Sequence, residues 1–246
     1  MDGIGSTPTH WQGLLDTFRD YVAFLRNPRL PAQQLPFSRL AWSQVFKIFT
    51  INAASTAIVV AVLFAIRSTG FELPSRTRPD LDPAVLFLTA VIAAPLFEEW
   101  LFRSWLSARK FDLALGASVG GMMAMVGLTL LLFGKPNLSQ FGFMAAGWAI
   151  ATAFLLAPRR KDQSIWPPIK YNFHKLFWIS SATVALAHLI NYEEEMGMVL
   201  ILMVIPQFVG GTLLGYARVT IGLWASIVLH AMHNAALVTL LLTLPE

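Results

Sequence analysis

The sequence contains no cysteine and little charge. Only 13% of its 246 residues are Asp, Glu, Lys or Arg, whereas an ordinary soluble domain carries about 25%. The absence of cysteine excludes disulfides, thiolate nucleophiles and cysteine-ligated metals. Hydrophobic residues make up 56% of the chain and gather in long apolar runs. These features predict an all-α fold, a polytopic membrane helical bundle, rather than a soluble domain.

The excess of basic over acidic residues does not indicate a nucleic-acid-binding protein. The 18 Lys and Arg residues exceed the 14 Asp and Glu residues, but they are scattered near the ends of the apolar runs. Such positions are typical of residues that orient a membrane protein and contact lipid headgroups. We therefore expect the lipid bilayer, and no nucleic acid, as a partner.

Seven apolar segments are each close to the length of about 20 residues that a transmembrane helix needs. They lie at 46–66, 84–106, 113–133, 138–157, 176–192, 198–216 and 221–244. If the N-terminus is cytoplasmic and the spans alternate, 13 Lys and Arg residues fall on the cytoplasmic side and 4 on the other, with Arg103 inside a span. This bias follows the positive-inside rule. We expect a multi-pass protein of the cell (inner) membrane, with the N-terminus inside and the C-terminus outside.

The chain divides into an N-terminal cytoplasmic or interfacial segment, residues 1–45, and one membrane domain, residues 46–246. Within residues 11–26, apolar residues recur at helical spacing and charged residues lie off that face. This pattern predicts an amphipathic helix. The helix lies in the membrane interface, or it packs on the cytoplasmic end of the bundle.

Two adjacent carboxylates and an arginine interrupt the second apolar segment. A carboxylate in the middle of a bilayer costs at least about 2.5 kcal/mol, so Glu98 and Glu99 need partners or a wet cavity. Glu99 and Arg103 are four residues apart and share a helix face, which allows them to pair. Glu98 lies about 100° round the helix and remains free to face another neighbour. A pair that only fixes helix packing would leave Glu98 unexplained.

Three further polar residues lie inside later spans. His188 is in the fifth span, and His230 and Asn234 are four residues apart on one face of the last. Counted from the cytoplasmic ends of their spans, these residues and Glu98 lie about 12–20 Å deep, at about 1.5 Å per residue. We predict that three helices bring the four side chains into one site.

This residue set suits two kinds of hydrolytic site. In the first, a carboxylate and an imidazole activate water while a second imidazole and an amide stabilise an oxyanion. In the second, His188, His230 and Glu98 bind Zn²⁺, with water in the fourth position. His233, about 60° round the helix from His230, is either a further ligand or a residue that faces another helix.

At these residues the sequence resembles the CPBP family of intramembrane proteases, named for CAAX proteases and bacteriocin-processing enzymes. The resemblance covers roughly residues 84–240. The family's three motifs are Glu-Glu-x-x-x-Arg, Phe-x-x-x-His and His-x-x-x-Asn. They are matched in turn by Glu98, Glu99 and Arg103, by His188 with Val184 in place of the phenylalanine, and by His230 and Asn234.

The resemblance implies an intramembrane endopeptidase whose substrate is a protein or peptide in or at the membrane, including CAAX-like prenylated ones. The family has been described both as metal-dependent and as glutamate-dependent, and we expect the second. Glu98 would then be the general base, assisted by His188. His230 and Asn234 would form the oxyanion hole, and Glu99 and Arg103 would orient the site. No cofactor is expected, and zinc is the alternative.

Two other functions compete with the protease. A secondary transporter or proton relay also places Glu and His in the middle of a membrane. It needs a polar path to both faces, whereas the outer halves of these spans are apolar. A non-catalytic immunity or scaffold protein would keep the fold but lose a motif residue, and none is lost here. The sequence therefore favours the protease.

Overall fold

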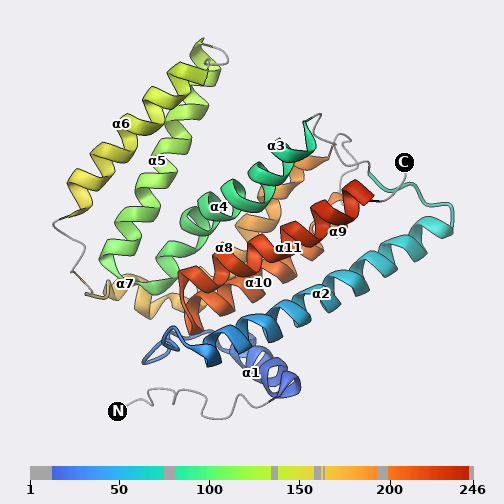
Figure 1. Ribbon diagram of the computed structural model, residues 1–246. Coiled ribbons are helices and arrows are strands. Elements are labelled where there is room, and N and C mark those ends of the chain that lie inside the picture. Colours follow the sequence, from blue (N-terminus) through green and yellow to red (C-terminus); the bar gives the residue numbers. More distant parts are fainter. Residues whose placement is uncertain are drawn as a thin grey trace.

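The computed structural model describes residues 13–74, 81–133, 138–157, 162, 164–192 and 199–243 as a bundle of helices (Figure 1). The all-α prediction is confirmed, because the described ranges contain no strand, and Arg109 and Ile165 form an isolated bridge. The longer helices are α2 (Arg39–Ser68), α5 (Lys110–Phe133), α6 (Leu138–Leu156), α8 (Phe173–Ala187), α10 (Ile205–Thr220) and α11 (Leu223–Thr243). The shorter ones are α1 (Leu14–Arg26), α3 (Pro83–Phe87), α4 (Ala94–Arg103), α7 (Pro167–Tyr171) and α9 (Val199–Met203).

Within these ranges, five helical stretches are long and apolar enough to cross a membrane, as expected of a multi-pass membrane protein. They are Arg39–Ser68, Pro83–Ser107, Lys110–Leu132, Phe173–Asn191 and Leu223–Thr243. The predicted count of seven is not confirmed. Met144–Leu156 is a shorter apolar helix. The segment expected at 198–216 is divided between α9 and α10 at Val204, two residues before Pro206, whose missing N–H disfavours a continuous helix.

The segments expected on the cytoplasmic side meet at one end of the bundle. The Leu35 N–H donates to the Thr220 carbonyl (2.8 Å), and the Lys110 N–H donates to the Ser164 carbonyl (3.0 Å). The first bond joins the segment before α2 to the last residue of α10. The second joins the first residue of α5 to the segment before α7. These contacts bring together segments that the sequence places on the cytoplasmic side, and the number of spans and their orientation in the membrane stay predictions.

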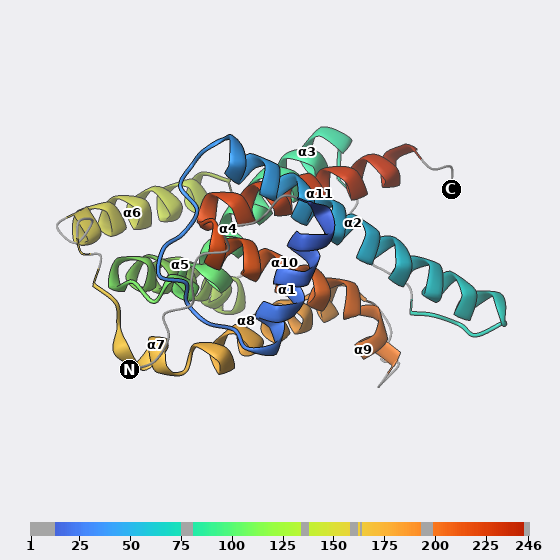
Figure 2. The ribbon, with the colours of Figure 1, turned by 90° about the horizontal axis from the view of Figure 1, so that it is seen from below.

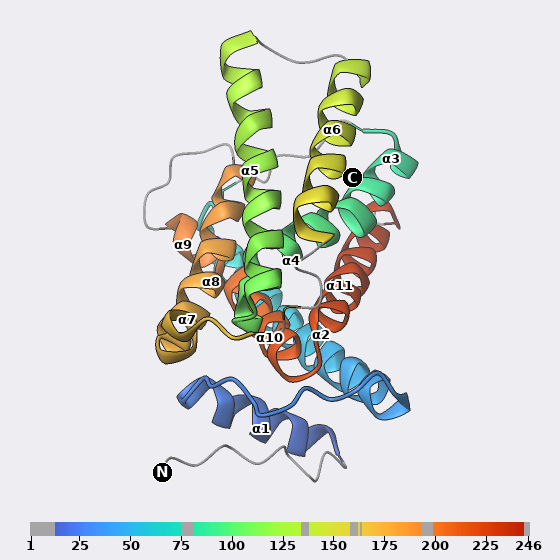
Figure 3. The same ribbon diagram turned by 90° about the vertical axis from the view of Figure 1, so that its left-hand side faces the viewer.

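Helix α1 lies across the same end of the bundle, beneath α10 and the start of α2 (Figures 2 and 3). Its inner face is polar as well as apolar. The Thr17 hydroxyl donates to Gln44 Oε1 (2.9 Å), and the Tyr21 hydroxyl is 2.6 Å from that of Thr212. Burial raises the pKa of Tyr21, which therefore stays protonated at neutral pH. The predicted amphipathic helix is confirmed, and it packs on the bundle.

Helix α10 is the most enclosed element of the bundle, with every residue from Gly211 to Val219 buried. It packs against α8, α2 and α11. Its approach to α8 depends on Gly215, because a Cβ at that position would lie 2.8 Å from Cε2 of the Phe177 ring. Helix α11 lies beside α4 and its N-terminal extension (Figure 1). This arrangement places the motif residues of α4 and α11 face to face.

Candidate active site

The helix that carries Glu98 and Glu99 is irregular where it approaches the site. Residues Leu88–Ala93 form a π-helical segment, η1, between α3 and α4. The Ala90 carbonyl in this segment accepts a hydrogen bond from Asn234 Nδ2 of α11 (2.7 Å). Single π-turns inside α-helices are common at functional sites. One of the two amide hydrogens of Asn234 is therefore used to join α11 to the helix of the two carboxylates.

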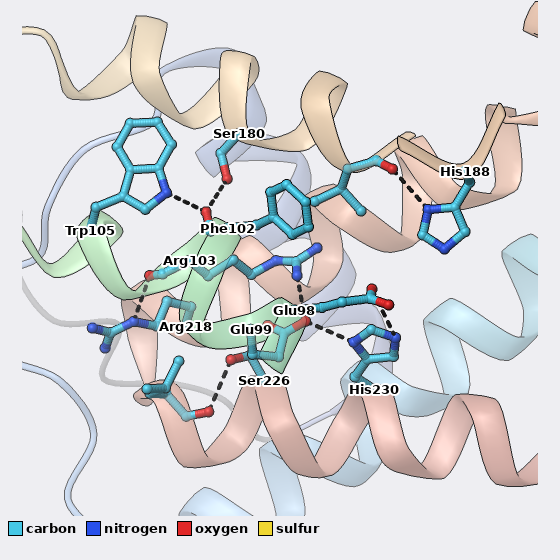
Figure 4. Close-up of polar contacts among 12 residues, drawn as sticks. Glu98, Glu99, Phe102, Arg103, Trp105, Ser180, His188, Arg218, Ser226 and His230 are labelled. Atoms are coloured by element: carbon cyan, nitrogen blue, oxygen red, sulfur yellow. Dashed lines mark hydrogen bonds and ion pairs between the residues drawn. The ribbon is translucent and has the colours of Figure 1, made fainter. Parts of the chain in front are cut away.

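Glu99 and Arg103 form the ion pair that their spacing predicted (Figure 4). Both side chains are buried, with 0% and 1% of their surface exposed. The same carboxylate oxygen, Glu99 Oε1, is 2.8 Å from Nδ1 of His230 on α11. A buried charge is tolerated only with such partners. Glu99 thus joins α4 to α11 through Oε1, while its buried Oε2 has no hydrogen-bond partner among the described residues.

Glu98 is the less occupied of the two carboxylates. Its ionisable neighbour on α11 is His230, whose Nε2 is 3.9 Å from Glu98 Oε2, too far for a direct hydrogen bond. Oε2 is buried and has no hydrogen-bond partner among the described residues, although 29% of the side chain is exposed. The predicted division between a paired Glu99 and a free Glu98 is confirmed.

The contacts of His230 determine which of its nitrogens carries the proton. A carboxylate oxygen paired with arginine can only accept, so the Nδ1 of His230 donates to Glu99. In the neutral ring, Nε2 then has a lone pair and faces Glu98. The imidazole is oriented in the way that a catalytic or ligating histidine requires.

His188 ends α8, at the point where the chain turns into a 3₁₀ segment, His188–Asn191. Its Nδ1 lies 2.8 Å from the Val184 carbonyl and must donate to it, which leaves Nε2 free. In Figure 4 the His188 ring and the Glu98 carboxylate lie on the same side of Arg103. In the described part of the chain, however, the imidazole in contact with Glu98 is that of His230.

The residues of the zinc alternative, His188, His230 and Glu98, do not form a ligand set. No three His, Cys, Asp or Glu side chains in the described ranges are grouped so that they could hold a metal ion. Each histidine does have Nδ1 in a hydrogen bond, and Nε2 makes none that the structure records, as in metal-ligating histidines. The arrangement of these described side chains therefore does not fit a preformed zinc site.

His233 takes one of its two predicted roles, because it faces another helix. Its Nδ1 lies 3.2 Å from Asn52 Nδ2 on α2. Since an amide nitrogen can only donate, the His233 Nδ1 accepts and its proton is on Nε2. Within about one turn, α11 therefore makes polar contacts with α2 through His233, with α4 through His230 and with η1 through Asn234.

The sequence reasoning missed the arginine that holds the end of α4. Arg218, buried on α10, donates to the carbonyls of Arg103 and Ser104 and to Asp112 Oδ2, each at 2.9 Å. Carbonyls at the end of a helix lack backbone donors, and a cation there is favourable. Arg218 had been counted only as a cytoplasmic charge. The position of Arg218 at the end of an otherwise apolar run was the sequence feature that could have indicated a structural role.

Two further side chains secure the same end of α4 and were also missed. The Ser180 hydroxyl of α8 donates to the Phe102 carbonyl (2.6 Å), and the indole nitrogen of Trp105 donates to the same oxygen. The first bond joins α4 to α8 one residue before Arg103, and the second joins α4 to the segment that directly follows it. No sequence pattern distinguishes Ser180 from the neighbouring serine, because its role depends on the packing of a distant helix.

A comparison with protein families matches this chain to the model described as type II CAAX prenyl endopeptidase Rce1-like, over residues 80–174 and 170–236. No curated protein and no solved structure matches the chain. The matched ranges cover more than half of the 246 residues and include all of the predicted site residues. The chain therefore belongs to the Rce1-like family of type II CAAX prenyl endopeptidases and is a membrane protease of the CAAX type.

Proposed function

We propose that this protein is an intramembrane endopeptidase of the cell membrane that hydrolyses a peptide bond in a CAAX-like, prenylated protein or peptide. The single observation that carries the proposal is the meeting of Glu98 and His230 beside the buried Glu99–Arg103 pair. Family membership supports the class of reaction, and these contacts support the assignment of the residues.

The separation of Glu98 Oε2 and His230 Nε2 suits a bridging water. Both atoms are hydrogen-bond acceptors when the imidazole is neutral, and they are 3.9 Å apart. A water molecule offers each of them one hydrogen, which a direct contact between two acceptors cannot do. Glu98 takes the proton as the water oxygen attacks the scissile carbonyl, and His230 orients the water. Glu98 returns the proton to the amine when the C–N bond breaks.

Glu99 and Arg103 orient this site without touching the reacting atoms. The Glu99 carboxylate keeps the His230 proton on Nδ1, and therefore keeps the lone pair of Nε2 directed at the water. Arg103 pairs with the same Glu99 oxygen, and a carboxylate oxygen paired with arginine accepts the hydrogen bond from His230. This is the orienting role expected from the sequence.

The oxyanion is assigned first to Asn234, whose second amide hydrogen is not used by the Ala90 carbonyl. A preorganised donor of this kind is the usual way to stabilise a tetrahedral intermediate. His230 was expected to share this role. With Nδ1 donating to Glu99, it donates from Nε2 only after it has gained a proton. His188, with its free Nε2, is assigned to assist Glu98.

The proposal is tested by incubating the purified protein with a prenylated CAAX peptide and, in parallel, with the same peptide lacking the prenyl group. We expect cleavage of the prenylated peptide only, with release of the carboxyl-terminal tripeptide, identified by mass spectrometry. Folded protein that cleaves neither peptide would contradict the proposal. Proton or ion flux across vesicles containing that protein would then favour the transporter alternative.

A further inference from the structure

The backbone of η1 leaves one carbonyl without its usual donors. In an α-helix the Ala90 carbonyl would accept from Ala94, but the Ala94 N–H bonds to the Thr89 carbonyl instead. In a π-helix the donor to Ala90 would be the next residue, Pro95, which has no N–H. Neither of the two residues that could close this turn therefore reaches the Ala90 oxygen.

Asn234 supplies the missing donor from another helix. Its Nδ2 is 2.7 Å from the Ala90 carbonyl. On the same face of α11, one turn earlier, His230 contacts Glu99 at 2.8 Å. These two contacts, on either side of the fully buried Pro95, hold α11 against the helix that carries Glu98.

We propose that Pro95 is a positioning residue for the proposed peptide hydrolysis. By withholding an N–H from the Ala90 carbonyl, it creates the acceptor to which Asn234 anchors α11. That anchor holds His230 Nε2 at its 3.9 Å distance from Glu98 Oε2. The catalytic part of this inference rests on the proposed function, and the part about the hydrogen bond does not.

A purely packing role for Pro95 predicts a different behaviour. Proline inside a membrane helix is tolerated when the freed carbonyl finds another partner, and an alanine at such a position is a better helix former. If Pro95 only fills space, Pro95→Ala leaves turnover unchanged. If Pro95 maintains the π-turn, Pro95→Ala lets the backbone close on Ala90, which rotates Glu98 and Glu99 about their helix axis relative to α11.

The first measurement compares the kinetics of Pro95→Ala and Pro83→Ala on the prenylated peptide. Pro83 is exposed at the start of α3, where a missing N–H removes no helical hydrogen bond. We expect Pro95→Ala to lower kcat about 10- to 100-fold, as a misplacement of around 1 Å does. KM and melting temperature should change little, and Pro83→Ala should match the wild type. Wild-type kcat in Pro95→Ala would overturn the proposal.

The second measurement tests the hydrogen bond itself and needs no activity. Asn234→Leu is made in the wild type and in Pro95→Ala, and the four proteins are melted in detergent. Asn234→Leu should lower the melting temperature of the wild type, because it orphans the Ala90 carbonyl. The loss should be clearly smaller in Pro95→Ala, where the backbone supplies a donor.

The two measurements separate the failure of this inference from the failure of the proposed function. If Asn234→Leu lowers the melting temperature equally in the wild type and in Pro95→Ala, the proposed role of Pro95 is overturned, whatever the enzyme cleaves. If Pro95→Ala does not fold, the melting temperature of Asn234→Leu in the wild-type background becomes the test. A melting temperature at or above that of the wild type would show that the hydrogen bond to the Ala90 carbonyl does not stabilise the protein, and would overturn the proposal. If the wild type cleaves nothing, the proposed function fails, and the melting temperatures still test the contact.

Discussion

Removing the Arg103 side chain should destabilise this protein more than any substitution at an exposed charge. Arg103→Leu leaves the Glu99 carboxylate, 0% exposed, without its paired arginine, and the contact with His230 remains. Breaking a buried ion pair from one side costs about 3–5 kcal/mol, because the other charge stays buried. In proteins of this size 1 kcal/mol corresponds to about 2–4 °C, so the melting temperature should fall by about 6–20 °C.

The exposed pair in α1 provides a matched control. Arg19 and Asp16 lie 3.7 Å apart with 77% and 44% of their side chains exposed, so Arg19→Ala should cost at most about 1 kcal/mol. Both variants are melted in the same detergent and followed by tryptophan fluorescence. The double variant Glu99→Leu, Arg103→Leu should melt above Arg103→Leu, because no unpaired charge remains. A loss for Arg103→Leu no larger than that for Arg19→Ala would refute the reasoning.

Three further predictions concern topology, packing and metal. A reporter fused after Glu246 should lie outside the cytoplasm, as the Lys and Arg distribution requires, and a cytoplasmic signal would contradict the layout. Gly116→Ala should cost about 1–3 kcal/mol, because a Cβ there would lie 2.1 Å from Ser104 Oγ. Gly127→Ala, with open space at the same point, should stabilise by about 0.5–1 kcal/mol; equal melting temperatures for the two variants would contradict this packing. Exhaustive chelation should leave peptide cleavage unchanged, and a loss that Zn²⁺ restores would favour the zinc alternative.

The parts of the site that follow from spacing within one helix could be predicted from the sequence. Glu99 and Arg103 are four residues apart, as are His230 and Asn234, and each pair shares a helix face in the structure. The apolar runs likewise indicated the membrane bundle, because the length of a span is set by the thickness of the bilayer. The division between a paired and a free glutamate required only the 100° turn between neighbouring residues.

The parts that depend on contacts between distant segments could not be predicted. The sequence predicts that His188 and His230 lie at a similar depth in the membrane, but depth does not determine which imidazole faces Glu98. That choice depends on the rotation of each helix about its axis, which the contact of His230 with Glu99 sets. Arg218 was missed for the same reason, because its partners lie more than 100 residues away in the chain.

The predicted number of membrane-crossing helices is not confirmed at a place where a sequence window ignores a local break. Residues 198–216 are apolar on average, but the helix restarts at Ile205 after Val204. Pro206 was a visible signal for this break. The π-turn at Leu88–Ala93 was less visible, because a proline in an apolar helix more often produces a simple kink.

The central claim is that the Glu98 carboxylate activates the water, and the turnover of Glu98→Gln tests it most directly. Glutamine keeps the size and polarity of the side chain but cannot take a proton. The variant and the wild type are assayed on the same prenylated peptide, at equal folded concentrations established by melting. We expect kcat to fall by about 10²–10⁴-fold, as for a lost general base, with little change in melting temperature. A Glu98→Gln variant that retains wild-type kcat would contradict the claim.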